Sequence, residues 1–173
     1  KYIISYFVVF SYTNSFFYIF NGKIDMVINM NFERLFFLRE EKDLTQEDMG
    51  KILNVSRVAI SQWETGKEII PLEKLNIYSN YFNVSLDYIL QISNVKEYKI
   101  INKSIDPKIV GKRLLYTRHK FDITQEELAK DLNTTHSTIS AYESGKTLIL
   151  TSFVYEIAIK YKLSLDWLCG KID

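Results

Sequence analysis

Side chains that commonly perform catalysis or bind metals are scarce in this sequence. The chain has one cysteine, Cys169, and two histidines, His119 and His136, which lie 17 residues apart. A single cysteine cannot form an internal disulfide, and a nucleophilic thiol needs a neighbouring base that the sequence does not supply. Glycine-rich phosphate loops, paired-carboxylate motifs and metal-ligand spacings are not present in the sequence. We therefore expect no enzyme, no metal and no cofactor, and we place Cys169 in a hydrophobic core.

Hydrogen-bonding side chains gather instead on one face of a short predicted helix and on its equivalent later in the chain. The first face consists of Arg57, Val58, Ser61 and Gln62. The second face consists of His136, Ser137, Ser140 and Ala141. In a DNA major groove Arg57 can form two bonds with guanine, Gln62 can bond adenine, and Val58 can contact a thymine methyl group. The second face has shorter side chains and discriminates bases less well. The alternative interpretation is that both faces are solvated surfaces.

A duplication accounts for the two faces. A shift of 79 residues aligns residues 34–90 with residues 113–169 without a gap, and 19 of the 57 aligned positions are identical. We name residues 31–92 copy one and residues 108–173 copy two, and we expect the polar residues 93–107 to form a linker. Each copy is close to the lower size limit of an independent fold, so a well-packed helical core is expected.

Helix-end signals define the elements that position these faces. In copy one, Thr45 and Asp48 form a capping box that begins a helix ending at Asn54, a residue tolerant of left-handed geometry. Ser56 can cap the next helix, which runs to Gly66 as its C-terminal cap. The same signals occur in copy two, at Thr124, Glu127, Asn133, Thr135 and Gly145. Two helices joined by a turn of three or four residues form a helix-turn-helix unit.

Further helices are predicted on either side of this unit. One covers residues 72–81, and a last short helix begins after Ser85. Asp106 and Pro107 provide the cap and first residue of the helix that opens copy two. Each copy should therefore contain five helices.

Both copies resemble the Cro/C1-type (XRE) helix-turn-helix family of bacterial and phage DNA-binding regulators. The resemblance rests on LTQEDMGKILNVSRVAISQWETGK with SLDYIL, and on ITQEELAKDLNTTHSTISAYESGK with SLDWLCG. It covers about 125 of the 173 residues. It implies an all-α fold of two tandem five-helix, lambda-repressor-like domains, with an N-terminal extension of uncertain structure.

The resemblance also implies roles for residues around the two faces. The residues expected at DNA phosphates are Gln46, Ser56, Lys67, Gln125, Thr135 and Lys146. Arg39 with Glu64, and Arg118 with Glu143, match positions that form a structural ion pair between the first and third helices. We assign these four residues to the fold and not to DNA.

Residues 1–30 differ in composition from the rest of the chain. They include nine of the 25 aromatic residues, all within the first 20 positions, and polar residues interrupt every apolar run. Met26 and Met30 precede the first well-patterned segment, so we expect this leader to be translated upstream sequence or a loosely ordered extension. A membrane anchor in residues 2–20 and an extra packed element are the alternatives.

Charge is distributed unequally between the two copies. The whole chain has a formal net charge of +1, which excludes a highly basic nucleic-acid coat protein. Copy one has 7 basic and 10 acidic residues, and copy two has 10 basic and 8 acidic residues. Because phosphate contacts dominate affinity and base contacts specify sequence, we expect copy two to anchor and copy one to discriminate.

The sequence thus predicts a cytoplasmic, nucleoid-associated protein that binds double-stranded DNA. Its expected role is that of a repressor of a phage, plasmid or mobile-element operon. Self-association into a homo-oligomer and the relative direction of the two half-sites stay open, and no membrane association is expected. One alternative is an antitoxin-like protein-interaction module in which one copy no longer reads DNA. The other is a membrane-tethered regulator that uses residues 2–20.

Overall fold

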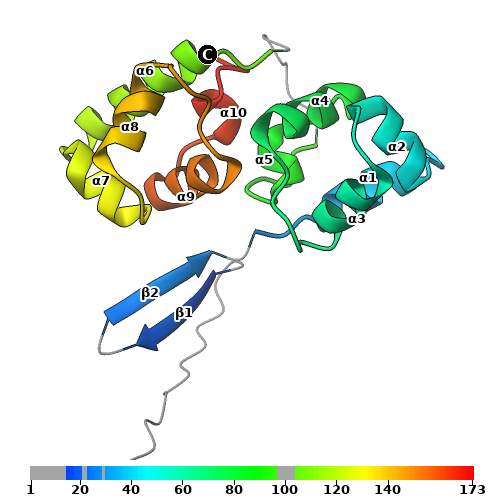
Figure 1. Cartoon of the computed structure of the whole chain (residues 1–173), viewed down its shortest axis with the longest axis horizontal. Helices are drawn as coiled ribbons and strands as arrows, with labels where there is room; N and C mark the ends of the chain where they lie inside the picture. Colours follow the sequence, from blue (N-terminus) through cyan, green and yellow to red (C-terminus); the bar gives the residue numbers. More distant parts are fainter. Residues whose placement is uncertain (1–14, 21–22, 29, 97–103) are drawn as a thin grey trace, which may run out of the picture. The chain divides into compact units, whose positions relative to one another are not determined.

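The computed structural model describes residues 15–20, 23–28, 30–96 and 104–173 (Figure 1). Contacts divide the chain into two compact units, Lys1–Asn31 and Phe32–Asp173. The first unit contains the described strands, and the second contains the described helices.

The N-terminal unit contains a two-stranded antiparallel sheet. β1 (Ser15–Phe20) pairs with β2 (Lys23–Ile28) so that Phe20 lies opposite Lys23. We did not predict these strands, although their aromatic and β-branched residues favour β-structure. The Asn21-Gly22 pair between them is also typical of a two-residue hairpin turn, which was the sequence signal for this element.

Most of the alternative membrane segment, residues 2–20, lies outside the described residues, which begin at residue 15. Within the part of the chain that the structure describes, no helix combines the length and apolarity needed to cross a membrane.

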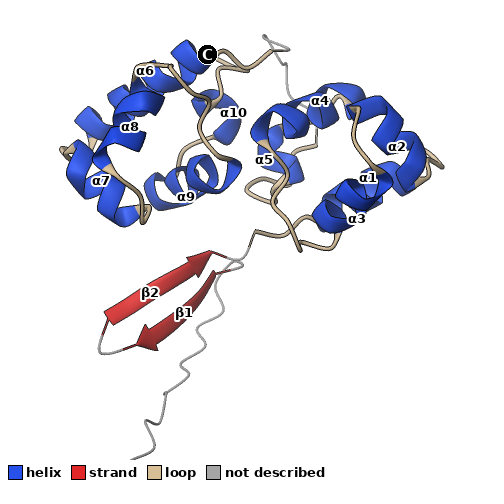
Figure 2. Ribbon diagram, in the orientation of Figure 1, coloured by secondary structure: helices blue, strands red, loops and turns tan. Residues whose placement is uncertain are grey.

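The second unit consists of two sets of five helices (Figure 2). Copy one contains α1 (Glu33–Glu40), α2 (Gln46–Leu53), α3 (Arg57–Glu64), α4 (Leu72–Phe82) and α5 (Leu86–Ile89). Copy two contains α6 (Pro107–Lys120), α7 (Gln125–Asp131), α8 (His136–Glu143), α9 (Thr151–Tyr161) and α10 (Leu165–Leu168). This order confirms the predicted all-α fold of tandem five-helix sets for the helical unit.

Capping interactions set the ends of the helices that matter for the site. The Thr45 hydroxyl accepts a bond from the Asp48 backbone nitrogen at 3.1 Å, and the Asp48 carboxylate accepts one from the Thr45 backbone nitrogen at 3.1 Å. Asn54 has a φ of 52°, and Gly66 has a φ of +70° with open space around it. Copy two repeats the capping box at Thr124 and Glu127 and the positive φ at Asn133 and Gly145, although a Cβ on Gly145 would lie 2.8 Å from the Lys108 Cα atom. The left-handed residues end the helices and turn the chain sharply.

Equivalent positions of the two copies form equivalent cores. The shared buried positions, given as copy-one and copy-two pairs, are Met49 and Leu128, Leu53 and Leu132, Ile60 and Ile139, Trp63 and Tyr142, Leu75 and Val154, and Leu86 and Leu165. Cys169 is also completely buried, and burial raises the pKa of its thiol. It is therefore a core residue in copy two.

A close backbone approach fixes α8 against α6. A Cβ atom placed on Gly111 would lie 2.4 Å from the Tyr142 carbonyl oxygen and 2.5 Å from that of Glu143. Both atoms belong to the backbone, which cannot move aside easily. Because Gly111 has no side chain, α6 can pack directly against the backbone at the end of α8.

An arginine at the same position of each copy ties the first helix to the last. Arg34 donates to the Tyr88 carbonyl oxygen at 2.5 Å, and its guanidinium lies 4.2 Å from the Tyr88 ring centroid. Arg113 donates to the Trp167 carbonyl oxygen and lies 5.1 Å from the Trp167 ring centroid. We did not predict these contacts, although the identity of Arg34 and Arg113 under the 79-residue shift was the available signal.

Candidate nucleic-acid interface

The N-terminal end of α3 presents its side chains to solvent. The Ser56 hydroxyl accepts a bond from the Ala59 backbone nitrogen at 3.2 Å, so this residue caps the helix. Arg57 is exposed, and Val58 is 62% exposed, which is unusual for a valine in a small helical domain. Ile60, one turn further along, is buried and fixes the rotation of the helix. The helix therefore has an apolar inner face and an outer face that begins with Arg57.

The remaining two members of this face are less free. Ser61 and Gln62 are half-buried, and the Gln62 amide donates to the Glu68 carboxylate at 3.2 Å. This bond uses one hydrogen of the Gln62 amide and holds the side chain toward Glu68.

The equivalent face on α8 has smaller side chains. His136 and Ser137 are exposed, whereas Ser140 and Ala141 are half-buried. His136 Nε2 lies 3.7 Å from an oxygen of the Glu126 carboxylate. This face offers small polar groups and one imidazole.

Thr135 caps α8. Its hydroxyl accepts a bond from the Thr138 backbone nitrogen at 3.2 Å and lies 2.9 Å from the Ser137 hydroxyl. The Thr135 and Ser137 hydroxyls are therefore held together at the beginning of the helix.

A buried ion pair supports α3 from behind. Arg39 Nε donates to Glu64 Oε1 at 2.6 Å, and Arg39 Nη2 donates to Glu64 Oε2 at 3.0 Å. The two side chains are 5% and 4% exposed, and the bond with Glu64 raises the pKa of the Arg39 guanidinium above its ordinary value. Arg39 Nη1 also donates to the Leu44 carbonyl oxygen at 2.7 Å. The pair joins α1, the loop before α2 and the end of α3.

The same support occurs in copy two with slightly more exposure. Arg118 Nε donates to Glu143 Oε1 at 2.7 Å, and Nη2 donates to Oε2 at 3.2 Å. The side chains are 14% and 6% exposed. The bond with Glu143 raises the pKa of Arg118.

The two glutamines expected at phosphates also contact these ion pairs. Gln46 Nε2 donates to Glu64 Oε2 at 2.9 Å, and Gln125 Nε2 donates to Glu143 Oε2 at 2.6 Å. Each amide nitrogen carries a second hydrogen. The ion pair therefore orients the glutamine at the start of α2 or α7, where helix amide groups favour an anion.

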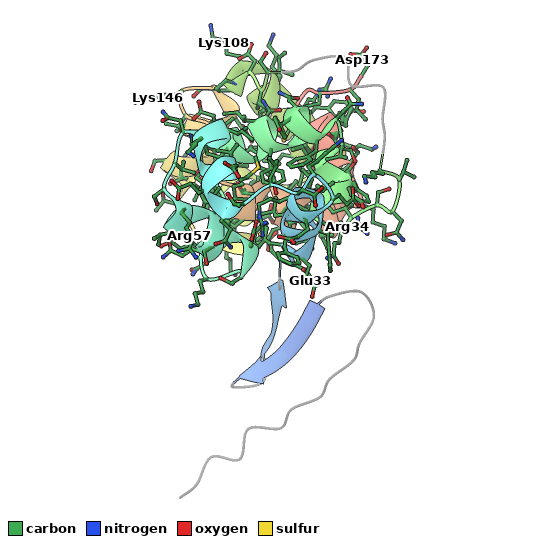
Figure 3. The ribbon with its side chains drawn as sticks, turned by 90° about the vertical axis from the view of Figure 1, so that its right-hand side faces the viewer. Glu33, Arg34, Arg57, Lys108, Lys146 and Asp173 are labelled. Carbon is green, nitrogen blue, oxygen red and sulfur yellow. The ribbon has the colours of Figure 1, made fainter. Side chains whose placement is uncertain are left out.

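The two lysines beyond the C-terminal glycines are solvent-exposed. Lys67 follows Gly66, and Lys146 follows Gly145. Figure 3 places Arg57 and Lys146 on the same side of the helical unit, opposite Arg34 and Asp173. Arg57 of copy one and Lys146 of copy two thus lie on the same side in this view.

Comparison with known proteins places both segments in one family. A family model described as Helix-turn-helix matches residues 37–89 and 115–168. No solved structure gives a significant match.

Three curated proteins are similar to parts of this chain. An HTH-type transcriptional activator BcrR of Enterococcus faecalis is 47% identical over 58 residues, which are 34% of this chain and 28% of that protein. The antitoxin PezA of Streptococcus pneumoniae serotype 4 is 29% identical over 92 residues, 51% of this chain and 58% of that protein. An uncharacterized HTH-type transcriptional regulator YobD of Bacillus subtilis is 29% identical over 73 residues, 42% of this chain and 65% of that protein.

The chain thus spans less than two thirds of the length of each of these relatives. The family match, in contrast, extends over both repeats and more than half of the chain. The protein therefore belongs to the Cro/C1-type family of helix-turn-helix proteins, and it contains the family's domain twice.

Proposed function

We propose that this protein binds double-stranded DNA sequence-specifically through α3 and α8. The observation that carries the proposal is the exposed N-terminal end of α3, where Arg57 and Val58 face solvent on a helix whose rotation is fixed by its buried residues. A helix in this setting enters the major groove and presents its first residues to base edges. Arg57 supplies the only side chain on either face that can form the two parallel bonds with guanine.

The two copies contribute differently in this proposal. Copy one has the longer base-reading side chains but an excess of acidic residues, and copy two has an excess of basic residues. Phosphate contacts supply most of the affinity, whereas base contacts supply the sequence preference. Copy two therefore anchors the protein through residues such as Lys146, and copy one discriminates through Arg57.

The biological role that follows is regulation of transcription. Two of the relatives are described as transcriptional regulators, one of them an activator. We propose a cytoplasmic regulator that acts on a phage, plasmid or mobile-element operon, with repression as the simplest outcome because bound protein blocks access to the promoter.

A second candidate function is binding of a protein partner through copy two. It is favoured by the small side chains of α8, where Ala141 occupies the position of Gln62, and by the similarity to a protein described as an antitoxin. In this case α8 reads no bases and copy one alone contacts DNA.

Selection of bound sites from a random duplex pool distinguishes these functions. A DNA-binding regulator should return a consensus, and replacement of Arg57 by Ala should relax one position of it at a cost of about 1–3 kcal/mol. Lys51→Ala, which removes an exposed cation from α2, is the matched control and should leave the consensus unchanged. A consensus of two halves favours reading by both copies, and a single half favours the second candidate. Failure to enrich any sequence would refute the proposal.

A further inference from the structure

The contact between α5 and α10 is reciprocal. Asp166 Oδ1 accepts a bond from the Leu86 backbone nitrogen at 3.0 Å, and its Oδ2 accepts one from the Asp87 nitrogen at 2.9 Å. Asp87 Oδ1 accepts a bond from the Leu165 backbone nitrogen at 2.6 Å, and its Oδ2 accepts one from the Ser164 hydroxyl at 2.6 Å. Asp87 and Asp166 are equivalent under the 79-residue shift, as are Leu86 and Leu165. Each carboxylate therefore caps the first turn of the other copy's last helix.

Reciprocal contacts of equivalent residues indicate a two-fold relation. When residue i of one body contacts residue j of the other and j contacts i, the surfaces are related by a half-turn, whereas a head-to-tail arrangement joins unlike surfaces. Figure 1 agrees, since α5 and α10 lie at the boundary while α4 and α9 occupy opposite edges of their halves. The two copies are thus related by a pseudo-two-fold axis through the α5–α10 contact.

Further bonds between the two copies have no counterpart in the opposite direction. Lys171 Nζ donates to the side-chain oxygens of Asn76 and Asn80, at 2.6 Å and 2.8 Å. The position equivalent to Lys171 in copy one is Ile92, which cannot donate such bonds. The Thr151 hydroxyl donates to the Ile70 carbonyl oxygen at 2.6 Å, and its copy-one equivalent is a leucine. Pairing of copy one with copy two of the same chain therefore satisfies polar groups that pairing of two identical copies would leave unsatisfied.

The α5–α10 contact, which we call the joint, is also buried, and burial opposes separation of the two copies. Asp87 is 2% exposed, and Asp166 and Lys171 are not exposed at all. Burial raises the pKa of Asp166 to about 6 and lowers that of Lys171 to about 8, so opposite charges face the interior near pH 7. Separation of the copies would expose apolar surface and break the hydrogen bonds of both carboxylates.

We propose that the two copies form one rigid DNA-binding unit. Its DNA target is a pair of unlike half-sites in inverted orientation, separated by a single spacing. The inference rests on the proposed function and adds the geometry of the target. A half-turn that relates α3 to α8 matches the local two-fold axis of a DNA duplex. In the view of Figure 3, Arg57 and Lys146 lie on the same side of the helical unit, as contact of both copies with one duplex requires. The α5–α10 contact, and not the length of the linker, sets the spacing.

The test combines selected DNA with two changes of geometry. Sites are first selected from a random pool with the full chain, and the spacer between the halves of the best site is then lengthened by five base pairs. Half a helical turn moves one half-site to the opposite side of the duplex, so affinity should fall about a hundredfold, to that of a single half-site. A chain with four residues added between Lys96 and Ser104 should select the same spacing and show the same fall.

Disruption of the joint provides the complementary measurement. Asp87→Asn replaces a carboxylate that accepts bonds through both of its oxygens, and it should let the chain accept several spacings. Glu73→Gln, which removes one charge from the exposed side of α4, is the matched control and should keep the single spacing.

The possible outcomes separate the two proposals. Selection of halves in direct repeat, a cost below threefold for the longer spacer, or a spacing that changes with the added linker residues would overturn the rigid inverted pair while leaving DNA binding intact. Failure of the full chain to select any sequence would refute the proposed function, and the inferred target geometry would fall with it.

Discussion

Loss of the arginine that supports α3 should destabilise copy one strongly. In the protein, Arg39 and Glu64 form two parallel bonds of 2.6 Å and 3.0 Å, and their side chains are 5% and 4% exposed. Arg39→Met keeps the length of the side chain but leaves the Glu64 carboxylate buried with the Gln46 amide and without its cation. Removal of one partner from a buried ion pair costs about 3–5 kcal/mol, because the remaining charge is desolvated without compensation. This is a large part of the roughly 5–15 kcal/mol by which a domain is stable.

The assay is urea denaturation followed by tryptophan fluorescence. The chain has two tryptophans, and Trp63 lies in the core of copy one at 5% exposure. A Trp167→Phe background therefore makes the signal specific for copy one. The midpoint and slope give the free energy of unfolding of the parent and of Arg39→Met.

Two further variants separate lost charge from lost packing. Arg39→Met with Glu64→Gln removes the buried charge and should recover much of the loss, as a double-mutant cycle will measure. Arg118→Met can be measured through Trp167 fluorescence in a Trp63→Phe background. It should lower the free energy of unfolding by less than Arg39→Met does, because Arg118 is 14% exposed. A cost of less than about 1 kcal/mol for Arg39→Met, or no recovery in the double variant, would contradict our assignment of this pair to the support of the fold.

Three other predictions address the fold, the joint and the DNA contacts. Gly111→Ala should lower the free energy of unfolding by about 1–3 kcal/mol, because its Cβ would lie 2.4 Å from the Tyr142 carbonyl oxygen; thermal denaturation checks this, with the exposed Lys112→Ala as control. Burial lowers the pKa of Lys171 from 10.5 to about 8, so the unfolded chain binds more protons between these values. The free energy of unfolding should therefore gain a contribution of roughly 3 kcal/mol as pH rises from 8 to 10.5, and this contribution should be absent from Lys171→Met in urea titrations at several pH values. Lys146→Ala should weaken binding about equally to all sequences and reduce the slope of log affinity against log salt by about 1, whereas an unchanged slope would remove Lys146 from the phosphate contacts.

Local signals in the sequence predicted the helical unit well because its helix ends are set by single residues. The capping hydroxyls of Thr45 and Ser56 and the left-handed Asn54 and Gly66 each act on their own turn, so their positions in the sequence suffice. The pairing of β1 with β2 was not predicted, although the Asn21-Gly22 pair in the sequence between the two strands is also a local signal.

Contacts between distant residues were harder to predict. Asp87 and Asp166 were recognised only as matching letters of the repeat, because nothing in the sequence indicates that each carboxylate caps a helix of the other copy. Lys171 showed no pattern at all, since its partners Asn76 and Asn80 lie more than 90 residues away.

The outer face of α3 also includes a contact that the sequence did not predict. Its residues follow from helical spacing, but the bond from Gln62 to Glu68 depends on a loop conformation that spacing does not define.

Affinity for a selected duplex compared with a scrambled duplex of the same length and composition tests the central claim most directly. Both titrations should be made with the full chain at 50 mM and at 200 mM salt. If α3 and α8 read DNA as proposed, the selected duplex should bind at least about a thousandfold more tightly, and both affinities should fall steeply as salt increases. Equal affinity for the two duplexes, or binding that does not respond to salt, would contradict sequence-specific DNA binding by this protein.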